Sequence, residues 1–143
     1  MSRCTRPRDI AARRAAVTRR MYAWEDKWVP KEPTAPIAEL QRLAARIWRE
    51  NTRRRDRCPA VVAGRGLMQA GRLVSYCLGR CRIVLARNQR TRHVLIHEMA
   101  HALGPETHGS RFQNRYADLL IKYIDNQEEI RGQYQMPELW ARV

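Results

Sequence analysis

Long apolar runs are missing from this 143-residue sequence. It contains no stretch of 18 consecutive apolar residues, so no transmembrane helix is expected. The N-terminus, MSRCTRPRDIAARR, is basic and lacks the apolar region of a secretory signal. Internal repeats and low-complexity tracts are also missing. The sequence therefore predicts a cytoplasmic protein without membrane contact, and its length fits one domain, residues 1–143, with its own core.

Cysteine is scarce and shows no dense framework. The chain has four cysteines, for which free thiols are the expected state in a reducing compartment. Cys77 and Cys81 flank a predicted turn, but a C-x3-C pair without a second matching pair is a weak zinc-ribbon signal. A disulfide across the hairpin or a second metal site are the alternatives to ordinary thiols at these two positions.

Lysine is also scarce, although the chain is strongly basic. Lysine and arginine number 28 against 14 acidic residues, and 25 of the 28 are arginine. Residues 1–92 carry a net charge of +16, whereas residues 93–143 carry −2. Such an excess predicts non-specific contact with nucleic acid through the arginine-rich N-terminal two-thirds. The codon bias of a GC-rich genome is the alternative explanation for so much arginine.

Hydrophobic spacing predicts two helices in a basic N-terminal part, residues 1–50. The first helix covers residues 8–28, and the second covers residues 37–48 with Pro36 near its first turn. Three prolines between them indicate a stiff connector. The apolar stripe of the first helix contains Ile10, Val17, Met21, Trp24 and Trp28. That of the second contains Ile37, Leu40, Leu43, Ala44 and Ile47.

The predicted sheet and catalytic core occupy residues 58–125, and a tail follows at 126–143. The runs AVVA, RLVSYCL and CRIVLA predict short strands, the last two joined as a hairpin at Gly79–Arg80. A helix is predicted from about His93 to Leu103, ended by Gly104–Pro105. The last helix, RFQNRYADLLIKYI, has an apolar face made of Phe112, Tyr116, Leu119, Leu120 and Tyr123.

All four histidines fall between residues 93 and 108. In HEMAH, His97 and His101 are one helical turn apart, so both imidazoles can reach one metal ion. The rest of that helix is apolar, which predicts a buried helix whose histidines need a partner such as a metal. Glu98 stands where a carboxylate can take a proton from metal-bound water. Composition alone would produce this motif only about once in 150 such chains.

A catalytic zinc ion with two histidine ligands needs a third protein ligand and an open position. His108 is the leading candidate, because the turn after Gly104 can fold the chain back beneath the metal. Glu106, Asp118 or another downstream carboxylate are the alternatives. His93 lies roughly 12 Å along the helix from His101, so it cannot share a first shell with both histidines. His93 is expected to contact one of the metal-binding residues, to line the rim of the site, or to have no function.

Four segments carry a resemblance to a known class of enzymes: RMYAWED, CRIVLA, VLIHEMAHAL and THGSRFQNRYADLL. The chain resembles zincin metallopeptidases, in particular small HExxH metallohydrolases of actinobacteria and their phages, and more loosely SprT-like proteases. This resemblance implies an α+β fold of the zincin-like minimal type, with the small sheet packed on the HExxH helix between N-terminal helices and a C-terminal helix. It also implies one Zn²⁺ per chain, bound by His97, His101 and His108, with Glu98 as the base.

Two features depart from related families. In metzincins the third histidine follows the second by six residues, whereas His108 follows His101 by seven, and Met136 is only a weak candidate for a Met-turn. SprT-like proteases often carry a C-terminal zinc ribbon, but the 35 residues after His108 contain no cysteine. The resemblance therefore does not by itself imply a role on DNA-bound proteins.

The sequence thus predicts a zinc-dependent hydrolase that cleaves a protein or peptide substrate. Glu98 would deprotonate the metal-bound water that attacks the carbonyl, and would then return the proton to the leaving amine. Tyr76, Arg111 and Tyr116 are candidates to stabilise the oxyanion, and the sequence selects none of them. The alternative is a basic nucleic-acid-binding or structural protein with a non-catalytic metal site, closed by a fourth protein ligand.

Overall fold

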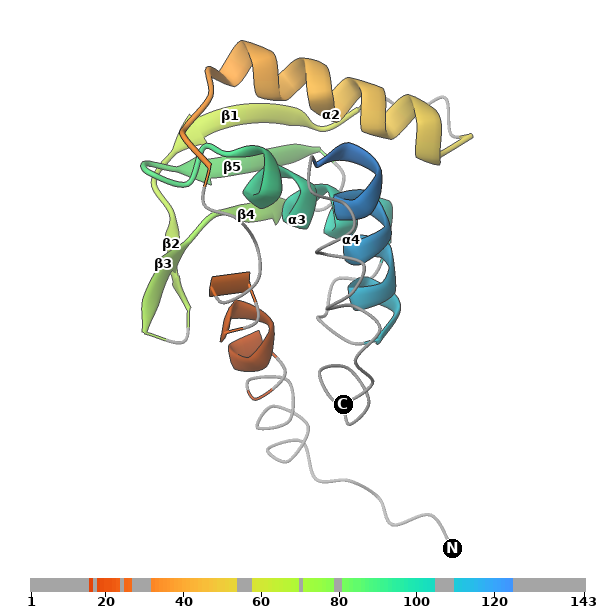
Figure 1. The fold of residues 1–143 in the computed structure, drawn as a ribbon. Coiled ribbons are helices and arrows are strands. Elements are labelled where there is room, and N and C mark those ends of the chain that lie inside the picture. The colour runs from red at the N-terminus through yellow and green to blue at the C-terminus, as the bar shows by residue number, and fades with distance from the viewer. Residues whose placement is uncertain are drawn as a thin grey trace, which may run out of the picture.

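The computed structural model describes most of the chain between residues 16 and 124. The described residues are 16, 18–23, 25, 26, 32–53, 58–69, 71–78, 81–104 and 110–124. Their helices and strands give a mixed α+β architecture (Figure 1), as the sequence predicted. In this part of the chain no helix is long and apolar enough to cross a membrane.

A three-stranded sheet, ordered β1-β5-β4, forms the β layer. Its strands are β1 (Ala60–Gly64), β4 (Tyr76–Leu78) and β5 (Arg82–Ala86). The edge strand β4 runs antiparallel to β5, with Cys77 opposite Ile83, which confirms the predicted hairpin. Its turn residues, 79 and 80, lie outside the described part. The parallel pairing of β1 with β5 joins strands far apart in the sequence, and the hydrophobic pattern did not predict it.

The run RLVSYCL is two strands rather than one. Strand β3 (Arg72–Val74) pairs with β2 (Leu67–Gln69) in a separate antiparallel sheet, and the chain leaves that sheet at Ser75. The Ser75 backbone N–H and hydroxyl both donate to Gln89 Oε1 at 2.8 Å, and the Ala86 N–H donates to Ser75 Oγ at 2.8 Å. These side-chain bonds replace the regular strand ladder at Ser75, which is why one β-rich run serves two sheets.

The central strand β5 is buried on both faces. Ile83 and Leu85 belong to the main hydrophobic core, whereas Val84 and Ala86 alternate to the opposite face. The chain leading into β2 passes closely over that second face. A Cβ at Gly66 would lie 2.5 Å from the Val74 carbonyl oxygen, so only glycine fits this crossing. In Figure 1 the β2–β3 hairpin extends away from α2 and α4.

Both helices predicted in the N-terminal part are helical at the residues that the structure describes. Helix α2 (Ile37–Asn51) begins directly after Pro36, and it contacts both α3 and β1. Its buried residues are Leu40, Ala44, Ile47 and Trp48. Of the stripe predicted for the first helix, Met21 is buried. The other four members, Ile10, Val17, Trp24 and Trp28, lie outside the described residues.

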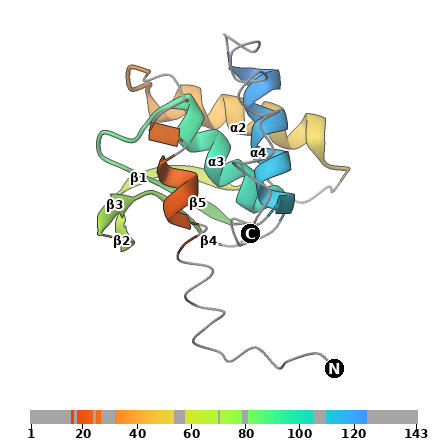
Figure 2. The ribbon, with the colours of Figure 1, turned by 60° about the horizontal axis from the view of Figure 1, so that its bottom comes forward.

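Helix α3 (Arg92–Leu103) is the central helix of the fold, in contact with α2, α4, β4 and β5 (Figure 2). The Thr91 side chain caps its start by accepting from the Val94 N–H, which the sequence analysis did not predict. Gly104 caps its end, as the sequence predicted. Helix α4 (Ser110–Tyr123) buries the predicted apolar face against this core. The HEMAH motif therefore lies inside the protein, with buried residues on nearly every side of its helix.

Candidate metal centre and its cavity

His97 and His101 lie side by side on α3, with ring centroids 5.1 Å apart and ring planes inclined at 61°. Two imidazoles bound to one tetrahedral zinc ion, each through a nitrogen at about 2 Å, have centroids roughly 5 Å apart. The observed pair fits this requirement without rearrangement of the helix. The prediction that one turn of helix brings these two rings together is confirmed.

An aromatic wall from α4 holds both imidazoles. The Phe112 ring stacks on His101 at 4.2 Å between centroids, and it lies 5.0 Å from His97. Tyr116 meets the His97 ring edge-on at 5.1 Å. Since Phe112 and Tyr116 are fully buried, the rings restrict the rotamers of both histidines and keep water from this side.

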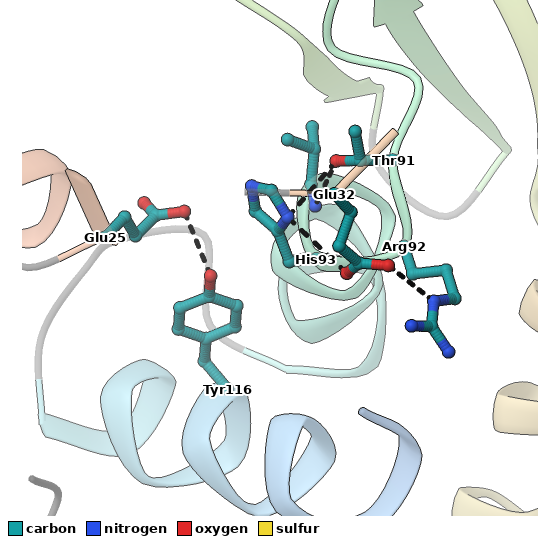
Figure 3. A network of polar contacts seen from close by, with 7 residues as sticks. Glu25, Glu32, Thr91, Arg92, His93 and Tyr116 are labelled. Atoms are coloured by element: carbon teal, nitrogen blue, oxygen red, sulfur yellow. Dashed lines mark hydrogen bonds and ion pairs between the residues drawn. The ribbon is translucent and has the colours of Figure 1, made fainter. Parts of the chain in front are cut away.

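The carboxylate of Glu25 reaches His97 from the N-terminal helical segment. Its Oε1 lies 3.1 Å from His97 Nδ1. Its Oε2 accepts a 2.9 Å hydrogen bond from the Tyr116 hydroxyl, which Figure 3 shows. Sequence reasoning missed Glu25. The segment RMYAWED carries part of the family resemblance, but nothing in it marks Glu25 as a residue that contacts α3. A carboxylate at Nδ1 leaves Nε2 as the nitrogen for a metal, the arrangement common to metal-binding histidines.

Glu98 is buried beside His97 and is only 6% exposed. No residue of the described part forms a hydrogen bond or ion pair with its carboxylate. Burial raises the pKa of Glu98 to about 7; the positive charge of His97 opposes this rise, and the negative charge of Glu25 adds to it. A carboxyl group with a pKa near neutrality can accept and return a proton at physiological pH, whereas a nearby cation would favour its ionised form.

The charges of Glu25 and His97 stabilise one another. Burial acts to lower the pKa of His97, but the charge and close contact of Glu25 outweigh it, so the pKa is raised. Burial likewise acts to raise the pKa of Glu25, and His97 and Tyr116 together bring it below its ordinary value. Protons therefore compete with metal ions for this histidine.

A cavity of about 300 Å³ opens beside this group. His97 and Glu98 form part of its wall, and other described lining residues come from the start of α3, the N-terminal helical segment, the connector before α2, the end of β3 and the turn after β5. Its acidic and histidine lining residues among those described are Glu25, Asp26, Glu32, His93, His97 and Glu98. None of the described residues that line it is arginine or lysine, although the chain as a whole carries a charge of +14.

His93 lines the same cavity one turn before His97. Its Nδ1 lies 3.3 Å from Thr91 Oγ1 and 3.7 Å from Glu32 Oε1. Glu32 also binds Arg92, whose Nε lies 2.6 Å from Oε2 (Figure 3). Burial lowers the pKa of His93, aided by the charge of His97 and opposed by Glu25 and Glu32. His93 thus contacts the connector before α2, and of its three predicted roles the cavity position matches the rim.

The third predicted metal ligand, His108, lies outside the described residues, as does Glu106. Asp118, the other named alternative, is exposed on α4. It stands two residues after Tyr116 and hence about 200° around the helix from the side that meets His97. Within the described ranges no three His, Cys, Asp or Glu side chains form a group that could hold a metal ion.

The three candidates for oxyanion stabilisation differ in position. The Tyr116 hydroxyl donates a hydrogen bond to the Glu25 carboxylate, which contacts His97. Tyr116 therefore supports His97 through Glu25 rather than stabilising an oxyanion. Arg111 is exposed on α4, and Tyr76 is half-buried on β4 outside the cavity lining. Cys58, Cys77 and Cys81 are thiols, as expected, and Cys4 lies outside the described part.

Comparison of the chain with family models, curated proteins and solved structures gives no match. Its function is therefore argued from the chemistry of the site.

Proposed function

We propose that this protein is a zinc-dependent hydrolase, of the metallopeptidase type, that cleaves peptide bonds. The observation that carries the proposal is the buried Glu98 carboxylate, which lines a cavity together with His97, the neighbour of His101. Burying a carboxylate without a partner is costly, and a residue is found in that state where its chemistry is used. A cation at the histidine pair would stabilise the Glu98 charge and give the carboxylate its role.

The donor set fits zinc rather than a hard cation. Imidazole nitrogen is a preferred ligand of Zn²⁺, whereas Mg²⁺ and Ca²⁺ select oxygen ligands. His97 and His101 would supply two ligands, and His108 remains our prediction for the third. When bound, the ion would supply a water molecule of lowered pKa and would polarise the substrate carbonyl.

Each protein group has a separate task in this proposal. Glu98 accepts the proton of the attacking water and later returns it to the leaving amine, for which the nearby cation would keep its carboxylate ionised beforehand. Phe112 and Tyr116 hold the imidazoles and exclude water behind them. The cavity in front of Glu98 receives the peptide segment on one side of the cleaved bond.

The zincin-like character of the fold belongs to the same proposal. The supporting features are the strand order β1-β5-β4 with an antiparallel edge strand, and the helix α3, which carries HEMAH and follows β5 after a short turn. The proposed chemistry requires this arrangement of site residues and no further similarity to the zincin fold, because function depends on the site rather than on the fold.

The proposal is tested by incubating the zinc-loaded protein with an unfolded protein substrate and a mixed peptide library, and by detecting new termini by mass spectrometry. Glu98→Gln should retain zinc and lose cleavage by about 100-fold or more, since the amide cannot act as a base. Glu39→Gln, an exposed glutamate on α2, is the matched control and should cleave normally. Equal cleavage by the Glu98 variant would contradict the mechanism.

A second candidate function is contact with nucleic acid, for which α2 supplies a specific observation. Arg42, Arg46 and Arg49 are exposed and follow one another at steps of four and three residues, so they form one stripe opposite the buried face. Arg46 also pairs with Glu50 at 2.9 Å. Such a stripe can follow a phosphate backbone, with a metal site that is structural rather than catalytic.

A salt series of duplex DNA binding separates this candidate from general attraction to a basic protein. Replacing the three stripe arginines by glutamine should reduce the slope of log K against log salt by about 2 to 3. Arg82→Gln with Arg87→Gln, two exposed arginines of β5 and the following turn, is the control. If both sets of substitutions change the slope equally per arginine, the α2 stripe is not a dedicated surface for binding nucleic acid.

A further inference from the structure

The Glu25 carboxylate joins the N-terminal helical segment to two other helices. Its Oε1 lies 3.1 Å from His97 Nδ1 on α3, and its Oε2 accepts the 2.9 Å hydrogen bond from Tyr116 on α4. Glu25 is 72 residues before His97 and 91 before Tyr116 in the chain. Its side chain is 13% exposed, so the contact is made largely away from water.

Two contacts hold the carboxylate, and of these only the contact with His97 balances its charge, when the imidazole is protonated. A buried carboxylate is stable only when hydrogen bonds or an opposite charge replace its water. Among the described residues, no arginine or lysine pairs with Glu25. Tyr116 supplies one neutral hydrogen bond, and His97 supplies the other contact through a ring nitrogen. A metal ion bound to Nε2, on the opposite side of the imidazole, would also supply a positive charge that balances the Glu25 carboxylate.

We propose that Glu25, oriented by Tyr116, is the positioning residue of the metal centre. It fixes His97 with its proton on Nδ1, so that Nε2 carries the lone pair that binds the ion. The N-terminal helical segment is therefore a component of the metal centre, although HEMAH lies far along the chain. This inference rests on the proposed function, because it assigns His97 as a metal ligand.

A purely structural role for Glu25 predicts a different outcome. If the contact only anchors the N-terminal segment, its loss lowers the stability of the metal-free protein but does not change the zinc affinity of folded molecules. Glu32 offers the matched control. It is equally exposed, at 13%, and it also reaches the start of α3, but its partners there are Arg92 and His93.

The experiment measures the zinc dissociation constant of the full chain by competition with a chromophoric chelator. Glu25→Gln should weaken zinc binding by roughly 10- to 100-fold, the usual effect of losing a carboxylate behind a metal-binding histidine. Tyr116→Phe should weaken it less and in the same direction. Glu32→Gln should bind zinc like the unmodified protein. Circular dichroism confirms that each variant is folded, and Glu25→Asp replaces Glu25→Gln if the latter is not.

Nitrogen-15 NMR of the histidine side chains supplies the readout that a structural role would not change. At alkaline pH in the absence of zinc, His97 should show the Nδ1–H tautomer in the unmodified protein. Glu25→Leu should shift it toward the Nε2–H form, whereas Glu32→Gln should not. This measurement tests the role of Glu25 even if the protein binds no zinc.

The outcomes separate the two proposals. If the unmodified protein binds zinc and Glu25→Gln binds it as tightly as Glu32→Gln does, the role of Glu25 is overturned and the hydrolase proposal stands. If no preparation binds zinc, the hydrolase proposal fails. In that case an Nδ1–H tautomer that depends on Glu25 still supports the positioning role, and a tautomer that does not depend on Glu25 overturns it.

Discussion

Glu25 Oε1 lies 3.1 Å from His97 Nδ1, a contact between residues 72 positions apart in the chain. This contact leaves Nε2 as the His97 nitrogen that the proposed zinc ion would use. Glu98 follows His97 directly and lines the adjacent cavity. We propose distinct tasks for these two carboxylates, in which Glu25 orients the His97 ring and Glu98 moves a proton.

The two outer histidines of α3 should respond differently to substitution. His101→Ala should lower zinc affinity by more than about 100-fold and abolish cleavage, because it removes a ligand. His93→Ala is the matched control on the same helix, and it should retain zinc because His93 contacts Glu32 rather than the metal position. Equal zinc loss in both variants, measured by equilibrium dialysis, would place His93 in the metal shell and contradict the assignment.

The stability of the metal-free protein should depend on Glu98 and pH. The pKa of Glu98 is about 7 in the folded protein and near its ordinary value of 4.5 when unfolded. The folded state thus holds the Glu98 proton more tightly, and the wild-type protein loses stability as pH rises from about 4.5 to 7. Glu98→Gln removes this loss.

Urea unfolding in the presence of a chelator checks this sign. The variant and the wild-type protein should be about equally stable at pH 4, and the variant should be more stable at pH 8 by up to about 3 kcal/mol. Parallel stability curves across this range would show that Glu98 is not buried as an uncompensated carboxylate.

Ser75 should be important for the wall of the cavity. Ser75→Ala deprives the buried Ala86 N–H of its 2.8 Å acceptor, and it removes one bond to Gln89. The expected loss is about 1–3 kcal/mol in the free energy of unfolding. Hydrogen exchange should accelerate at the Ala86 amide and in β3. If exchange at these amides is unchanged, the Ser75 hydroxyl does not hold the β2–β3 hairpin against β5.

The sequence predicted what local periodicity encodes. The helical segments around α2, α3 and α4, the buried face of α4 and the adjacency of His97 and His101 follow from 3.6-residue spacing and were confirmed, although α2 runs three residues beyond its predicted end, to Asn51. The parallel pairing of β1 with β5 and the break at Ser75 depend on contacts across the fold, which periodicity does not record. Glu25 was missed for the same reason, because one glutamate on an amphipathic segment resembles a solvated residue until its partner is known.

The most direct test of the metal centre is the zinc content of the purified, untagged protein, measured by elemental mass spectrometry beside His108→Ala. We expect about one zinc ion per chain in the unmodified protein and a strongly reduced content in the variant. No stoichiometric metal after zinc is supplied would contradict the account, and it would make the arginine stripe of α2 the better guide to function.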